Sequence, residues 1–100
     1  MNRVTAGETF SLTYDVASSG ETYTARVIDA VGKRMDCTVS ESSPNVTVSV
    51  DWQQWRNGQG GFGHVEIRRE DTKAIVKRDR FRIMEGLRAS ELMTDYGTPA

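Results

Sequence analysis

The residue best suited to acid–base chemistry is His64, the single histidine among the 100 residues of the chain. A histidine-based metal centre needs several ligands, and Cys37 is the single cysteine, so neither residue predicts a metal site. No serine or carboxylate stands at a recognisable spacing that would make His64 the base of a nucleophilic dyad or triad. The sequence therefore predicts a protein that is not an enzyme and has no cofactor. His64 is expected to be an ordinary strand residue, and Cys37 a buried, small apolar one.

A glycine-rich run, Gly58-Gln59-Gly60-Gly61-Phe62-Gly63, lies just before His64. A loop that cradles phosphate follows a strand and opens a helix, so that backbone N–H groups converge on the anion. This run precedes a strand instead. We therefore expect an irregular loop with unusual backbone angles rather than a phosphate site.

Aromatic residues of the same region allow two interpretations. Trp52, Trp55, Phe62 and Tyr14 could present flat faces on which a sugar ring stacks, which makes a small carbohydrate- or ligand-binding β-sandwich the alternative function. They could equally be structural, with Trp52 in the core and Trp55 closing one end of the fold. The sequence leaves both interpretations open.

Basic residues gather late in the chain, at Arg68-Arg69 and from Lys77 to Arg82, whereas the acidic residues Glu8, Asp15, Glu21, Asp29 and Asp36 are spaced along its first half. This asymmetry suits contact between copies of the chain or with a different acidic protein. It is also typical of a solvated sheet face, where charges discourage edge-to-edge aggregation. The net charge is −1, which gives no electrostatic reason to expect nucleic acid as a partner.

The elements that position these residues are predicted by strict alternation of apolar and polar residues. Residues 1–8 form a polar lead-in, and no 10–15-residue helical pattern follows. Strands are expected at 9–16, 22–29, 34–40, 45–50, 65–67 and 74–84. Six or seven short strands separated by turn signals favour an all-β antiparallel sandwich or barrel.

Three local features refine this picture. Asp51 can cap a helical turn over residues 52–55, because its carboxylate accepts free backbone N–H groups. Lys77 and Asp79 interrupt the apolar phase that links Ile75 with Phe81, so a bulge or an edge is expected there. No apolar run approaches the roughly 18 residues of a membrane span, so a membrane is not predicted as a partner.

The order of these pieces resembles a known family. It begins with Gly-Glu-Thr-Phe-Ser-Leu (7–12) and Val-Ser-Val-Asp (48–51), followed by Trp55. It continues with Gly-Phe-Gly (61–63), His-Val-Glu-Ile-Arg (64–68) and Arg-Phe-Arg-Ile (80–83). This order is similar to that of the small immunoglobulin-like β-sandwiches in tailed-bacteriophage virion proteins of baseplates, necks and tail or head fibres. The similarity spans about residues 7–84, with Phe62 where the family usually has tyrosine.

The resemblance implies an immunoglobulin-like sandwich with a structural or adaptor role and no catalytic residues. It also implies a location in the virion after assembly in the host cytoplasm, with other virion proteins and further copies of the chain as partners. We expect a sandwich domain over residues 1–85 and a C-terminal arm over 86–100. The residues predicted to form the interface are Trp55, Phe62, Arg80, Arg82, Leu87, Leu92, Met93 and Tyr96.

Overall fold

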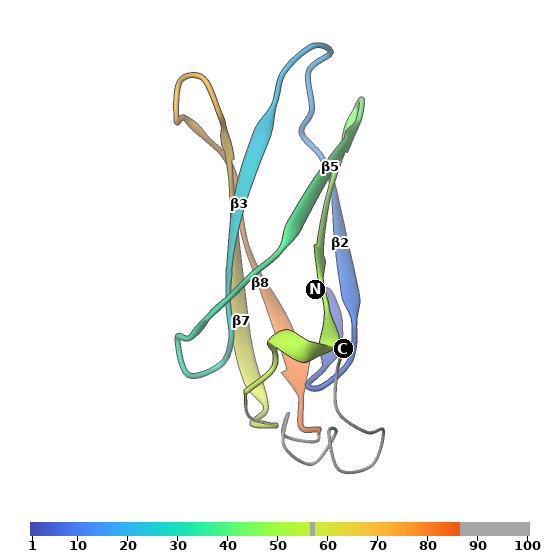
Figure 1. Ribbon diagram of the computed structural model, residues 1–100, viewed down its shortest axis with the longest axis vertical. Coiled ribbons are helices and arrows are strands. Elements are labelled where there is room, and N and C mark those ends of the chain that lie inside the picture. Colours follow the sequence, from blue (N-terminus) through green and yellow to red (C-terminus); the bar gives the residue numbers. More distant parts are fainter. Residues whose placement is uncertain (57, 87–100) are drawn as a thin grey trace.

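The computed structural model describes residues 1–56 and 58–86, and these fold into two packed β-sheets (Figure 1). In this part of the chain no helix is long and apolar enough to cross a membrane. The described strands are β1 (Arg3–Thr5), β2 (Phe10–Asp15), β3 (Tyr23–Ile28), β4 (Arg34–Met35), β5 (Thr38–Ser42), β6 (Asn45–Val50), β7 (Gly61–Arg69) and β8 (Ile75–Met84), with one 3-10 turn, η1 (Trp52–Gln54).

Sheet A has the strand order β1-β8-β7-β3-β4, and sheet B has the order β2-β6-β5. The strands that pair directly are far apart in sequence in several cases, and the two sheets face each other as layers of a sandwich. The division into β2, β6 and β5 against β3, β7 and β8 is that of the immunoglobulin fold, with the first strand moved beside the last. The predicted all-β, immunoglobulin-like sandwich is therefore confirmed.

Two details of the predicted strands are corrected. The lead-in 1–8 contains β1, which pairs with β8 in parallel rather than antiparallel fashion. The single strand expected over 34–40 is two strands, because β4 pairs with β3 in sheet A and β5 pairs with β6 in sheet B. The chain thus passes from sheet A to sheet B within this segment. The alternation of apolar and polar residues cannot reveal the change of sheet, because the apolar residues face the same core from either sheet.

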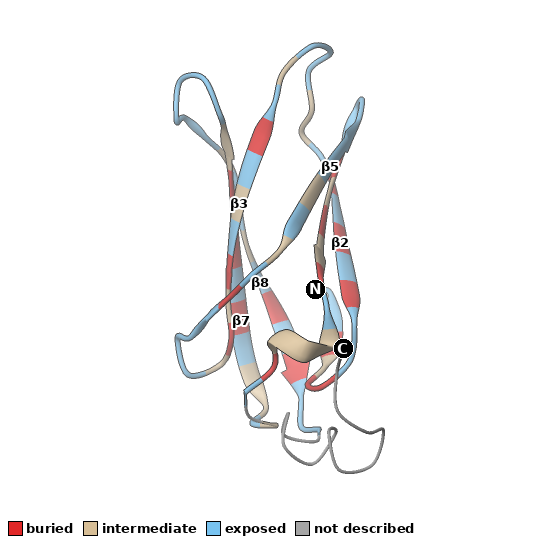
Figure 2. Cartoon of the chain, viewed as in Figure 1, coloured by how far each residue is buried: buried red, intermediate tan, exposed pale blue. Residues whose placement is uncertain are grey.

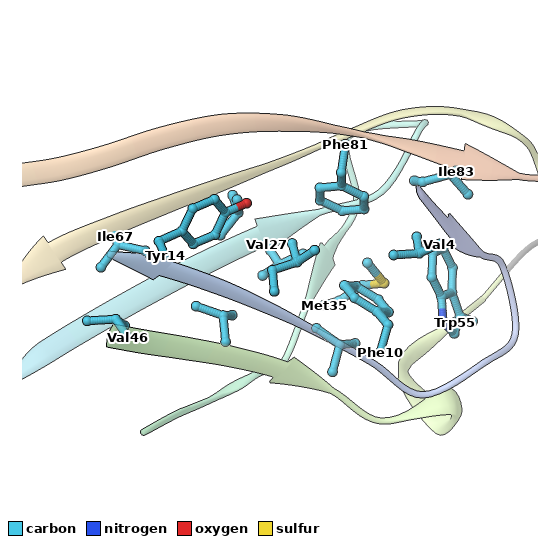
Figure 3. Close-up of a cluster of buried hydrophobic side chains, with 14 of the residues drawn as sticks. Val4, Phe10, Tyr14, Val27, Met35, Val46, Trp55, Ile67, Phe81 and Ile83 are labelled. Atoms are coloured by element: carbon cyan, nitrogen blue, oxygen red, sulfur yellow. The ribbon is translucent and has the colours of Figure 1, made fainter. Parts of the chain in front are cut away.

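The core is built from the inward residues of both sheets, as the buried positions show (Figures 2 and 3). Phe10 of β2 lies between Trp55 and Phe81, with ring centroids 5.7 and 5.5 Å away. Trp55 is fully buried, and its indole Nε1 donates a hydrogen bond to the carbonyl oxygen of Glu8 at 2.8 Å. Asp51 caps η1 as predicted, with its Oδ1 accepting the N–H of Gln53 at 2.9 Å.

The end of the glycine-rich run is regular structure, which corrects the prediction of a loop. β7 begins at Gly61, and Gly63 pairs with Phe81 of β8. A Cβ atom on Gly63 would lie 2.7 Å from Cε2 of Phe81 and 2.9 Å from the carbonyl oxygen of Ile28. Gly63 is therefore required by close packing of Phe81 and not by backbone flexibility.

The predicted irregularity in β8 is a bulge at Val76, because Ile67 pairs with Lys77 while Arg68 pairs with Ile75. The bulge moves Ile75 out of phase with Phe81 and leaves it on the outer side of the sheet. Asp79 faces inward instead, and its Oδ2 accepts the hydroxyl proton of Tyr14 at 2.7 Å. Burial and the Asp79 carboxylate raise the pKa of the Tyr14 hydroxyl.

Replacing Gly63 with alanine is expected to destabilise the fold by about 1–3 kcal/mol, because the new methyl group overlaps Phe81. Denaturant unfolding followed by tryptophan fluorescence measures the change. Ser40→Ala, at an exposed position of β5, is the matched control and should change the free energy of unfolding by about 0.5 kcal/mol or less. Equal stability of both variants would contradict the packing role of Gly63.

Candidate functional site

The outer face of sheet A collects an unusual set of cations. Since side chains alternate along a strand, the buried Val65, Ile67 and Phe81 leave their neighbours on the opposite side. The pairing register then brings together arginines from five strands. We call this set the arginine face, and it consists of Arg3, Arg26, Arg34, Arg68, Arg78, Arg80 and Arg82.

Glu66 is the one carboxylate that the described strands place on the arginine face. Seven arginines against one glutamate give the face a formal charge of +6. Because the whole chain carries −1, all its other residues together carry −7. The fold therefore turns a nearly neutral sequence into a molecule with one strongly cationic surface.

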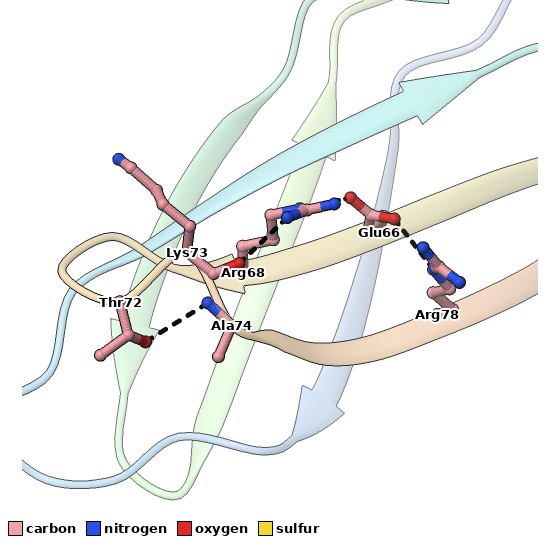
Figure 4. A network of polar contacts seen from close by, with 6 residues as sticks. All are labelled: Glu66, Arg68, Thr72, Lys73, Ala74 and Arg78. Carbon is pink, nitrogen blue, oxygen red and sulfur yellow. Dashed lines mark hydrogen bonds and ion pairs between the residues drawn. The ribbon is translucent and has the colours of Figure 1, made fainter.

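Glu66 occupies the middle strand of the face and binds two of the arginines (Figure 4). Its carboxylate oxygens lie 2.6 Å from Nε of Arg68 and 2.9 Å from Nε of Arg78. Hydrogen bonds from Arg68 and then Arg78 lower the pKa of the Glu66 carboxyl. Within residues 1–56 and 58–86 no ion pair involves the other five arginines of the face, namely Arg3, Arg26, Arg34, Arg80 and Arg82.

Exposed apolar side chains lie among these arginines. The Phe62 ring is 38% exposed, with the guanidinium carbons of Arg80 and Arg82 at 4.4 and 5.3 Å from its centroid. Ile75 is 41% and Met84 44% exposed, and both project from the same side of β8. Aromatic rings, methionine and arginine are the residue types enriched in protein interfaces.

A shallow depression of about 410 Å³ lies on this face beside Arg26, His64 and Glu66. His64 is exposed there, opposite Arg80 on β8 and Ile28 on β3. In the described part of the chain no group of three or more histidine, cysteine or carboxylate residues could hold a metal ion. The charged residues that line the depression are mainly cationic, with the carboxylates of Glu66 and Asp79 among them.

The outer face of sheet B shows that the cations are confined to one side. Its three strands present mostly serine and threonine, and hydroxyl pairs join Ser11 to Ser49 at 2.8 Å and Thr13 to Thr47 at 3.0 Å. Neutral side chains of this kind are sufficient to solvate the outer face of a sheet. The clustering of arginine on sheet A is thus a distinct property of that surface.

The structure separates the predicted interface residues. Phe62, Arg80 and Arg82 lie together on the arginine face. Trp55 is corrected, because its ring is fully buried and cannot contact a partner. Tyr14 is buried as well, and Trp52 is half-buried on η1 rather than in the core, so the aromatic platform for sugar is not assembled. Four further predicted residues, Leu87, Leu92, Met93 and Tyr96, lie outside the described residues, as does the arm beyond Gly86.

Sequence reasoning missed Arg3, Arg26 and Arg34 as parts of this surface. Arg26 and Arg34 occupy polar positions of alternating segments, so their outward direction is visible once the strands are recognised, whereas Arg3 lies in the stretch interpreted as a lead-in. Their neighbourhood depends on which strands pair, since Arg3 and Arg82 are 79 positions apart yet directly opposite. No local pattern contains that information.

The ion pairs of Glu66 lead to a pH prediction. The pKa of the Glu66 carboxyl is lowered in the folded state, so its ion pairs contribute stability at pH values above the ordinary carboxyl pKa. This stability is lost as the pH falls through the pKa of Glu66 in the folded state. Carboxyl NMR titration should place the Glu66 midpoint below that of an ordinary glutamate, and Arg78→Ala should raise it. Arg34→Ala, on the same face but unpaired with Glu66, should move the midpoint far less. Equal effects of the two variants would contradict specific pairing.

No protein-family model matches the chain, and no curated protein matches it. Among solved structures, a similar chain is the "Twitchin kinase region from C.elegans (Fn31-NL-kin-CRD-Ig26)". The superposition has a TM-score of 0.48 and 8% sequence identity, and covers 82% of this chain but 14% of that chain. A likeness of this size says nothing about activity, and the fold assignment rests on the strand topology itself.

Proposed function

We propose that this protein is a non-enzymatic docking module that binds an acidic protein surface through its arginine face. The observation that carries the proposal is the charge of that face, with seven arginines, one glutamate and five arginines without an ion pair to a described residue. Unpaired like charges on neighbouring strands repel one another, as at Arg3 and Arg82. Carboxylates of a partner would relieve that repulsion and form charge-assisted hydrogen bonds.

The composition of the face favours a protein over nucleic acid as the partner. All seven cations are arginine, and Phe62, Ile75 and Met84 are exposed between them, which is the composition of protein interface cores. Glu66 and the net charge of −1 oppose any polyanion, so the exposed apolar side chains, rather than the charges, favour a protein over nucleic acid.

The assembly role in a tailed-phage virion is the specific form of this proposal. It comes from the sequence resemblance, which implies virion proteins and further copies of the chain as partners. The immunoglobulin-like sandwich and a charged, partly apolar face are compatible with such a neighbour. The carbohydrate alternative has no comparable support, because Tyr14 and Trp55 lie in the core.

Charge reversal at two exposed positions tests the docking face. Arg80→Glu with Arg82→Glu lowers the formal charge of the face from +6 to +2. We expect at least a tenfold loss of affinity for a fluorescently labelled, capped glutamate oligomer, measured by fluorescence anisotropy at low salt. Binding by the unmodified protein should weaken as salt is raised, because exposed charges are screened.

The matched control reverses two cations that are not part of the face, Lys33→Glu with Arg56→Glu, and has the same net charge as the test variant. It should bind the oligomer like the unmodified protein. Equal losses in both variants would show that net charge alone drives binding and would overturn the proposal. A single-stranded oligonucleotide of equal charge that binds more tightly than the glutamate oligomer would overturn the choice of a protein partner.

A further inference from the structure

The outer edge of β8 is only partly covered. Along one side β8 pairs with β7 over most of its length. Along the other side its described neighbour is β1, which pairs only with residues Arg82, Ile83 and Met84. Ahead of β1, Asn2 also reaches this side of β8, with its carbonyl oxygen on the N–H of Arg82 and its side chain hydrogen-bonded to Tyr14. No described strand pairs with the stretch of β8 before Arg82 on this side, and we call this stretch the open edge of sheet A.

The backbone groups on this edge can be identified from the neighbouring hydrogen bonds. The N–H of Arg82 donates to the carbonyl oxygen of Asn2 at 2.9 Å, on the side away from β7. Every second residue of a strand directs its N–H and C=O to the same side, and the β7–β8 register is unbroken from Lys77 to Ile83. The N–H and C=O groups of Arg80 and Arg78 thus point to the open edge, where no described backbone group bonds to them.

The side chains beside this edge are charged on both surfaces of the sheet. Arg78 and Arg80 project from the outer surface, as part of the arginine face. On the inner surface the neighbours are Asp79, which is hydrogen-bonded to Tyr14, and Lys77, whose ammonium lies 5.7 Å from the Tyr14 ring centroid. Charged side chains beside an open edge usually prevent it from pairing with the same edge of another copy of the chain.

We propose that the edge of β8 at Arg78–Arg80 receives an extended acidic segment of the partner protein as an added β-strand. The identity of the segment as acidic rests on the proposed docking function. β1 shows that this edge accepts such pairing, because it occupies the same side of β8 one step further along. Strand addition satisfies the four free backbone groups, while the side chains of the segment select its sequence.

The geometry specifies the pattern of that segment. Residues on one face of a strand repeat every second position, at a spacing of about 6.8 Å. Carboxylates at alternate positions of the segment would therefore stand beside Arg78 and Arg80 on the outer surface. The intervening residues would lie beside Lys77 and Asp79, next to Tyr14, whose hydroxyl is already hydrogen-bonded to Asp79 and Asn2.

The probe for this proposal is a capped hexapeptide that alternates glutamate with valine. Amide hydrogen exchange is followed by NMR on the unmodified protein with and without the peptide. We expect the amides of Arg78 and Arg80 to exchange at least tenfold more slowly at saturation, because each gains a hydrogen-bond acceptor. Unchanged exchange at both amides, with the peptide shown to be bound, would overturn strand addition.

Two substitutions of one residue separate the backbone from the side chain. Arg80→Ala and Arg80→Pro both remove the guanidinium, but only proline also removes the edge N–H, which it can do without breaking a bond to β7. Strand addition predicts that Arg80→Pro binds the peptide about fivefold more weakly than Arg80→Ala, the effect of one hydrogen bond. Equal affinities would overturn it. If the proline variant fails to fold by circular dichroism, the exchange experiment on the unmodified protein decides.

These results distinguish the two proposals. If charge reversal at Arg80 and Arg82 abolishes peptide binding while Arg80→Ala and Arg80→Pro bind the peptide equally, the docking face is supported and the added strand is overturned. Peptide binding that survives the double reversal overturns the docking face. A peptide alternating lysine with valine should not bind, and binding by it equal to that of the glutamate peptide would overturn the acidic character of the segment.

Discussion

The packing of Phe81 against the bare backbone of Gly63 is the contact on which the rest of the molecule depends. It lets β7 and β8 pair closely while Phe81 reaches Phe10 of the opposite sheet, which in turn touches Trp55. This row of contacts joins both sheets and closes one end of the core. It also sets the register, because a slip of one residue would turn every inward side chain of a strand outward.

The surface electrostatics follow from that register. With Phe81 and Val65 inward, Arg80 and His64 must face out, and the neighbouring strands add further arginines to the same side. Sheet B carries neutral hydroxyl-bearing side chains on its own outer face, so the cations have no counterpart there. One face of a chain with net charge −1 thus attracts anions, and Glu66 tethers two of its arginines in fixed positions.

Side chains and backbone offer two different kinds of recognition on adjoining surfaces. The arginine face selects for negative charge, and the exposed Phe62 ring, which lies close to two guanidinium groups, adds apolar area. The open edge of β8 selects for an extended conformation, whatever the side chains of the partner are. The bulge at Val76 marks where regular pairing with β7 is interrupted. A partner that uses both features would be recognised by its charge pattern and its backbone shape together.

Alternating residues by themselves determined the class of fold, most strand positions and the inward residues, because the two-residue period of a strand is a local property. The cap at Asp51 and the irregularity in the last strand were also local enough to predict. Tertiary structure alone decided that Trp55 is buried, that residues 34–40 cross between sheets, and that Gly63 serves packing. It likewise decided which arginines share a face and which edge stays open. These outcomes depend on pairing between segments far apart in the chain, and pairing leaves no trace in a local pattern.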